Sequence, residues 1–186
     1  MDAISDVELV RAYLQGDEDA LTQLIRRYLK PVYNFLLRSG CAPHEADDVL
    51  QDAFVKAWLK LKKFDQAKSF KTWLFTIAKN TFLDSLKKKR PFSFSALEGD
   101  DGTFVTDVPD EAPLPDEILQ SMETVKTLEQ ALETLPIKDR MLMQLHYTQE
   151  LTLVEAAEVL KESADTVKSR HRRALHKLRV RLVPGR

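Results

Sequence analysis

The chain has 186 residues, five glycines, one cysteine and a formal net charge of −1 from 28 Lys and Arg and 29 Asp and Glu. This length suits one larger domain or two small ones, and the few glycines and few strand-like alternations favour an all-α fold. No apolar run is long enough to span a bilayer, and the N-terminus lacks the parts of a signal peptide. We therefore expect a cytoplasmic protein without membrane insertion, and the lone Cys41 fits a reducing compartment.

The charges are segregated along the chain. Residues 1–20 carry six acids against Arg11, a net charge of −5, and residues 91–125 carry nine acids without Lys or Arg, a net charge of −9. Residues 161–186 carry nine Lys and Arg against Glu162 and Asp165, a net charge of +7. Basic patches within a nearly neutral protein are compatible with DNA binding and argue against loose binding over the whole surface.

Three helices are predicted before residue 41. Ser5 or Asp6 can cap the first helix, and Asp17 can cap the second, because short polar side chains accept hydrogen bonds from a first helical turn. Pro31 predicts the start of a further short helix, since proline is tolerated in the first turn. Together with two later helices, these segments predict a compact bundle that ends near Arg90.

The stretch from His44 to Arg90 predicts two helices joined by a polar loop. The first helix has apolar residues at three-four spacing, and its opposite face is acidic toward the start. The loop at residues 62–69 is basic and contains Phe64, and the helix from Phe70 interleaves aromatic residues with Lys. Such rings can stack on unpaired bases while the cations contact phosphates. Each ring taken alone is more often a core residue, so both interpretations stay open.

Residues 91–115 differ in composition from the rest of the chain. This segment is acidic and contains Pro91, Pro109, Pro113 and Pro115, which predicts a flexible linker, because it can bury too little apolar surface to offset its chain entropy. Its apolar residues could pack into a groove of a partner or form a loose local cluster; they are Phe92, Phe94, Leu97 and Phe104.

Helical spacing resumes at Asp116 and continues to Pro136, and a further helix is expected from about Lys138. Thr152 and Glu155 form a capping box at the start of a short helix, and Ser163 can cap the last helix, residues 164–181. Two helices joined by a short turn, with the second rich in Lys and Arg, are typical of a helix-turn-helix motif. A solvated cationic helix is the alternative.

Two parts of the sequence carry a family resemblance. Residues 44–58 with residues 70–80, including Asp47-Asp48 and Trp73, resemble the second conserved region of bacterial sigma-70-type sigma factors. Residues 135–170, including Leu135-Pro136, resemble the fourth conserved region of the extracytoplasmic-function (ECF) branch. The resemblance implies two small helical domains: a region 2-like domain at residues 1–90 and a region 4-like helix-turn-helix domain at residues 116–186, joined by the acidic linker at residues 91–115.

The resemblance implies a transcription initiation factor that binds core RNA polymerase and directs promoter recognition and opening, with an anti-sigma factor as a further partner. The polymerase-binding candidates it implies are Asp48, Gln51, Asp52 and Val55. The candidates for the minus-10 element are Phe64, Lys68, Trp73, Lys79 and Asn80. The candidates for the minus-35 element are Asp165, Thr166, Lys168, Ser169, Arg172 and Arg173.

Three residues depart from the family's usual pattern. Lys161 and Glu162 stand where the family usually has glycine and an apolar residue, and His171 stands where it commonly has leucine. Glycine in such a turn often adopts positive φ, which lysine adopts at some cost. We therefore expect Lys161→Gly to stabilise this module, unless the turn has been rebuilt.

Catalytic and cofactor signals are absent from the sequence. There is no Gly-rich phosphate loop, Ser/His/Asp set or metalloprotease helix, so we expect neither an enzyme nor a cofactor. Cys41 and His44 could supply two metal ligands, but a zinc site needs about four, and a structural role for Cys41 is favoured.

Two alternatives use the same residues differently. A stand-alone helix-turn-helix regulator would explain the C-terminal half but leave the pattern at residues 47–80 unused. A helical interaction protein with weakened DNA contacts would rest on the altered turn at Lys161-Glu162.

Overall fold

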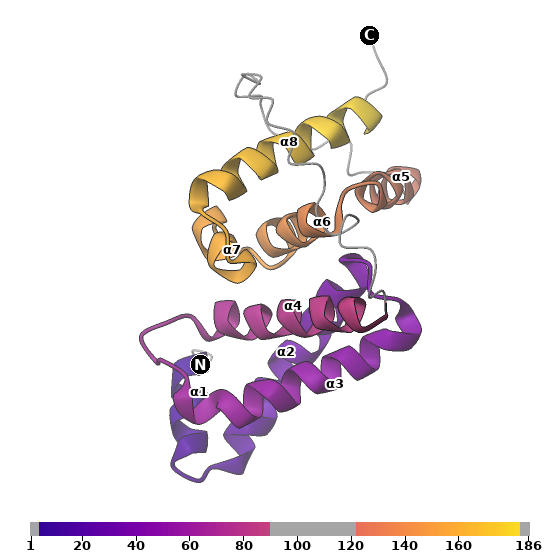
Figure 1. The fold of residues 1–186 in the computed structure, drawn as a ribbon. Helices are drawn as coiled ribbons and strands as arrows, with labels where there is room; N and C mark the ends of the chain where they lie inside the picture. The colour runs from indigo at the N-terminus through magenta and orange to yellow at the C-terminus, as the bar shows by residue number, and fades with distance from the viewer. Residues whose placement is uncertain (1–3, 90–121, 183–186) are drawn as a thin grey trace.

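The computed structural model describes residues 4–89 and 122–182, and it is helical throughout these ranges apart from short turns (Figure 1). The elements are α1 (Asp6–Leu14), α2 (Glu18–Arg38), α3 (Pro43–Lys60), η1 (Leu61–Lys63), α4 (Phe70–Lys89), α5 (Met122–Glu133), α6 (Ile137–Met143), η4 (Gln144–Thr148), α7 (Leu153–Leu160) and α8 (Ala164–Leu182). The all-α prediction is confirmed. No helix in the described ranges is long and apolar enough to cross a bilayer.

The first helices begin where the sequence predicts. Ser5 and Glu8 form a capping box at α1, in which the Ser5 backbone N–H donates to Glu8 Oε2 at 2.8 Å. Asp17 caps α2 by accepting from the Asp19 backbone N–H at 3.0 Å. Each cap satisfies an N–H group that has no partner within the helix.

The predicted short helix from Pro31 is wrong, because α2 runs without interruption from Glu18 to Arg38. Proline inside a helix removes one hydrogen bond and crowds the preceding turn. Burial outweighs that local cost here, since α2 places Tyr28, Val32 and Phe35 in the core on both sides of Pro31.

The core of the N-terminal half lies between α2, α3 and α4. Phe35 and Phe75 are fully buried and meet edge to face, with ring centroids 5.3 Å apart. Phe82 is also fully buried. For the helix from Phe70, the structure therefore assigns most of the aromatic rings to the core.

The C-terminal half is a second group of helices, α5 to α8 (Figure 1). The capping box of Thr152 and Glu155 starts α7, and Ser163 Oγ accepts from the Thr166 backbone N–H at 3.1 Å near the start of α8. A small apolar cluster joins α5, α6 and α8; it contains Ala131, Leu135, Met143, Ala174 and Leu178. The start of the predicted helix at Asp116 and the acidic linker lie outside the described residues.

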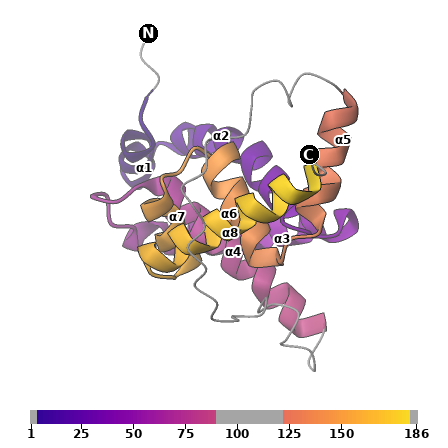
Figure 2. The same cartoon turned by 90° about the horizontal axis from the view of Figure 1, so that it is seen from above.

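The two halves pack against each other. Helix α4 of the first half lies against α7 of the second half, and α2 contacts α6 and η4 (Figures 1 and 2). One apolar cluster is continuous across this contact and includes Phe75 and Phe82 from α4 together with Ala156 and Val159 from α7. Lys71 of α4 also donates a hydrogen bond to the Gln149 backbone carbonyl. This contact determines which faces of α4 stay accessible.

Candidate nucleic-acid interface

The outer face of α3 presents an exposed stripe. Asp48, Gln51, Asp52 and Val55 are all exposed, and three-four spacing places them along one side of the helix. Leu59, one turn further on, is 78% exposed and extends the stripe with an apolar residue. Sequence reasoning missed Leu59, although its spacing from Val55 could have indicated it. An exposed face with both acids and large apolar residues is typical of a protein-binding surface.

The loop between α3 and α4 is organised by aromatic packing. The Phe64 ring is only 7% exposed and lies 5.0 Å from the Trp73 ring and 5.6 Å from the Phe70 ring. Lys68 is exposed at the loop tip, and Trp73 is partly exposed. In this arrangement Phe64 anchors the loop, and the exposed parts of Lys68 and Trp73 are available to a ligand.

Lys79 and Asn80 lie on α4 near the second half of the molecule. Lys79 is 4% exposed, and burial together with the nearby Lys161 lowers the pKa of Lys79 to about 8. Asn80 is partly exposed. The packing of α4 on α7 therefore covers Lys79, and sequence periodicity gave no signal of that contact.

Helix α8 presents the predicted recognition residues to solvent. Its buried row contains Val167, Ala174 and Leu178, as the periodicity predicts. All six predicted recognition residues are exposed: Asp165, Thr166, Lys168, Ser169, Arg172 and Arg173. Asp165 and Lys168 form an exposed ion pair at 3.8 Å. A basic helix with one open face has the shape and charge to enter a DNA major groove.

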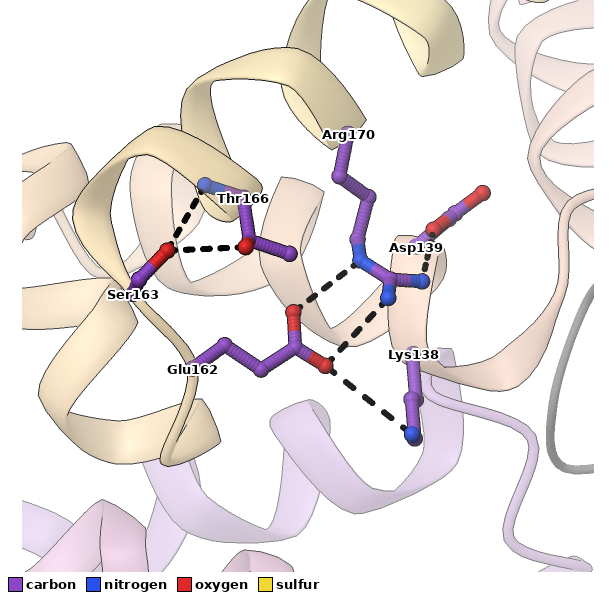
Figure 3. A network of polar contacts seen from close by, with 6 residues as sticks. All are labelled: Lys138, Asp139, Glu162, Ser163, Thr166 and Arg170. Atoms are coloured by element: carbon purple, nitrogen blue, oxygen red, sulfur yellow. Dashed lines mark hydrogen bonds and ion pairs between the residues drawn. The ribbon is translucent and has the colours of Figure 1, made fainter. Parts of the chain in front are cut away.

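The turn between α7 and α8 is held by an ion network that the sequence did not reveal (Figure 3). Arg170, 8% exposed, donates to Asp139 Oδ1 at 2.9 Å and to Glu162 at 3.2 and 3.3 Å. Lys138 lies 3.9 Å from the same Glu162 carboxylate. Glu162 therefore replaces apolar packing with charge-assisted hydrogen bonds. Lys161 has φ 59° and ψ 43°, the left-handed conformation expected at this position.

His171 belongs to an aromatic cluster at the start of α8. Its ring stacks on Tyr147 at 5.7 Å and meets His146 edge to face at 5.2 Å. The Tyr147 hydroxyl and His171 Nε2 share a hydrogen bond of 3.0 Å, and His146 Nδ1 donates to the Leu151 carbonyl at 2.7 Å. Burial and the neighbouring His146 lower the pKa of His171. Histidine thus packs where an apolar residue would be expected.

Metal-ligand candidates do not gather in the described residues. Cys41 is buried, and no group of three His, Cys, Asp or Glu side chains in residues 4–89 and 122–182 could hold a metal ion. The pair Cys41 and His44 thus gains no further ligand from the described part of the chain.

The fold and these surfaces define a class: a two-domain helical protein with a helix-turn-helix motif in its second half and an exposed acidic and apolar stripe in its first. Residues 24–92 match the family model for sigma-70 region 2, and residues 131–180 match the model for sigma-70 region 4. The chain is 33% identical over 176 residues to the ECF RNA polymerase sigma factor SigW of Bacillus subtilis, covering 93% of this chain and 94% of the relative. It is 32% identical to the ECF RNA polymerase sigma factor RpoE of Cereibacter sphaeroides, over 93% and 92% of the two chains.

The chain belongs to the ECF branch of the sigma-70 family of RNA polymerase sigma factors. These matches confirm the predicted family and favour a sigma factor over a stand-alone helix-turn-helix regulator.

Solved structures agree with the fold. A sigma factor RpoE from Bartonella quintana, in complex with the anti-sigma factor NepR, superposes with a TM-score of 0.66 at 26% identity over 87% of this chain and 96% of the other. CnrH, in complex with the cytosolic domain of CnrY, has the same fold, with a TM-score of 0.63 at 24% identity over 93% and 94% of the two chains.

Proposed function

We propose that this sigma factor docks on core RNA polymerase through the exposed stripe of α3. The observation that carries this proposal is the joint exposure of Asp48, Gln51, Asp52 and Val55 on one helix face, free of the packing that covers α4. Leu59 extends the surface and supplies apolar area to the contact. Acidic side chains around exposed apolar residues suit a basic partner with an apolar groove.

Promoter recognition is divided between the two halves in this proposal. The loop at residues 62–69 and the exposed parts of Trp73 and Asn80 capture the opened minus-10 element, with Lys68 on the phosphates. Phe64 contributes by fixing the loop, and Lys79 contributes after α4 separates from α7. Captured bases favour the open state, so no nucleotide hydrolysis by this chain is needed, and the protein acts as a factor rather than an enzyme.

Helix α8 reads the minus-35 element as duplex DNA. Lys168, Arg172 and Arg173 supply cations for base edges and phosphates, and the exposed Asp165, Thr166 and Ser169 supply short polar side chains. The working domains are residues 1–90 and 116–186, joined by the acidic linker at residues 91–115.

The cellular context follows from the same role. A partner of RNA polymerase works in the cytoplasm, where bacterial transcription takes place. The relative bound to the anti-sigma factor NepR supports an anti-sigma factor as a further partner of this chain.

Run-off transcription tests the proposal directly. Purified core RNA polymerase is mixed with this protein and a library of promoter fragments, and start-site-specific transcripts are expected. Asp52→Arg should reduce those transcripts by about ten-fold or more, because a reversed charge at a docking contact costs upward of about 1.4 kcal/mol. Glu129→Arg, an exposed charge reversal on α5, is the matched control and should leave them unchanged.

The outcomes separate the possible roles. Core binding without any transcript would instead indicate a decoy that occupies polymerase. Tight duplex binding without any core binding would favour the stand-alone regulator.

A further inference from the structure

A cavity of about 400 Å³ lies between α3, α4 and the turn after α7. Four lysines line it: Lys56 and Lys60 from α3, Lys87 from α4, and Lys161 from the turn. Among the described residues that line the cavity, Asp84 supplies the single carboxylate. The cavity therefore joins the two halves of the molecule and carries an excess of positive charge.

Three of the cavity lysines, Lys56, Lys60 and Lys161, carry the argument for an anion site. In residues 4–89 and 122–182, neither Lys60 nor Lys161 forms a salt bridge with a carboxylate, and the Lys56 ammonium donates to Thr81 Oγ1 at 3.3 Å. Glu162, the residue after Lys161, pairs with Arg170 and Lys138 (Figure 3). Cations held close together repel one another, so an anion between them would relieve a standing electrostatic cost.

The backbone fixes Lys161 as part of the wall. Its left-handed conformation ends α7, and the Glu162–Arg170 ion pair holds the next residue. Lys161 also lies near Lys79: burial is the main cause that lowers the pKa of Lys79 to about 8, and the charge of Lys161 is the second cause. Lysine is a common phosphate ligand and acts as a point charge.

We propose that this cavity binds a small anion with two or more linked phosphate groups, held by Lys56 and Lys60 of one half and Lys161 of the other. The cavity has the size of a small-molecule site, commonly about 300–1,000 Å³, whereas duplex DNA cannot enter a space this small. Because Lys161 belongs to the second half, the anion binds when the halves are packed together and stabilises that arrangement. Asn80 also lines the cavity, so an occupied site withholds that residue from a promoter.

Calorimetric titration of the full chain with inorganic pyrophosphate tests this, in low-salt buffer free of divalent cations, with sulfate at matched ionic strength for comparison. Saturable one-to-one binding is expected for pyrophosphate and weaker binding for sulfate. Lys60→Ala and Lys161→Gly should each weaken it about ten-fold, as expected for the loss of about 1.4 kcal/mol. Lys161→Gly removes the cation while keeping a residue suited to positive φ, so its fold is retained.

Lys30→Ala, an exposed lysine of α2 outside the cavity, is the matched control and should change the affinity by less than about two-fold. The proposal is overturned by an absence of saturable binding, by equal weakening in Lys30→Ala, or by an unchanged affinity in Lys161→Gly. A separate titration with a duplex DNA of arbitrary sequence overturns it if DNA binds, pyrophosphate does not, and Lys60→Ala and Lys161→Gly weaken the DNA binding, because these lysines would then serve backbone phosphates. No polymerase or promoter enters the titration, so its failure leaves the proposed function standing.

Discussion

At the scale of single residues, Lys161 and Glu162 show two different ways of departing from a family pattern. Lys161 keeps the left-handed backbone that glycine usually supplies, so the conformational cost remains. Glu162 gives up apolar packing, but it pairs with Arg170 and with Lys138. New ion pairs therefore compensate for the substitution at Glu162, whereas the backbone strain at Lys161 is not relieved.

Lys161→Gly should therefore raise the free energy of unfolding by about 0.5–1 kcal/mol, the left-handed penalty less the greater entropy of glycine in the unfolded chain. Urea denaturation measures this change. Lys161→Ala is the control, because alanine keeps a Cβ atom in the strained left-handed conformation. A loss of stability in Lys161→Gly would show that contacts of the lysine side chain outweigh the backbone strain.

His171 makes stability depend on pH. Its pKa is lowered in the folded protein, mainly by burial and then by His146, so the unfolded chain binds a proton more readily. The stabilising contribution is fully present above the unfolded pKa of about 6.5 and is lost as the pH falls through the folded pKa. Denaturation midpoints measured from pH 7.5 downward should decline in the native sequence.

His171→Gln should flatten that decline, whereas His176→Gln, at an exposed position of the same helix, should not. Parallel pH profiles for all three proteins would exclude His171 as the titrating group.

At the scale of elements, the apolar spacing and the caps predicted most of the helices. The caps at Ser5, Asp17, Thr152 and Ser163 were readable because each acts over three residues. The position of Pro31 within a helix could not be predicted, because the local sequence is similar for a proline that begins a helix and for one inside it. The choice depends on burial of Tyr28 and Val32 against α4 and the other core helices.

Replacing Pro31 by alanine should stabilise the protein by about 2 kcal/mol. The substitution restores one helical hydrogen bond and relieves the crowding, worth about 3 kcal/mol, while the unfolded chain regains about 0.4–1 kcal/mol of entropy. Thermal unfolding monitored by circular dichroism measures the change. A lower midpoint would mean that proline at this position favours the geometry that places both ends of α2 in the core.

At the scale of the whole molecule, the packing of α4 on α7 covers Lys79. A charged lysine at this contact is disfavoured by burial and by Lys161, as its lowered pKa shows. The packed arrangement is therefore held by apolar contacts at some electrostatic cost. That balance is compatible with the proposed separation of α4 from α7 on promoter binding.

Lys79→Met should stabilise the packed arrangement by about 1 kcal/mol, or roughly 2–4 °C in the unfolding midpoint of a chain of this size, because it keeps the apolar stem and removes the buried charge. The same substitution should weaken promoter binding if Lys79 contributes after separation. Lys88→Met, at an exposed position of α4, should change neither quantity. A lower midpoint for Lys79→Met would show that the ammonium group stabilises the contact.

The sequence by itself determined most of the helices, the two-part organisation and the family, because helical spacing, capping and short motifs are local properties of the chain. It also placed the exposed residues of α3 and α8, since their spacing separates one face from the other. Only the tertiary structure decided that Phe64 and Lys79 are buried, that Arg170 joins Asp139 to Glu162, and that lysines of both halves share one cavity. Those features depend on helices distant in sequence, and local patterns do not encode which helix will cover another.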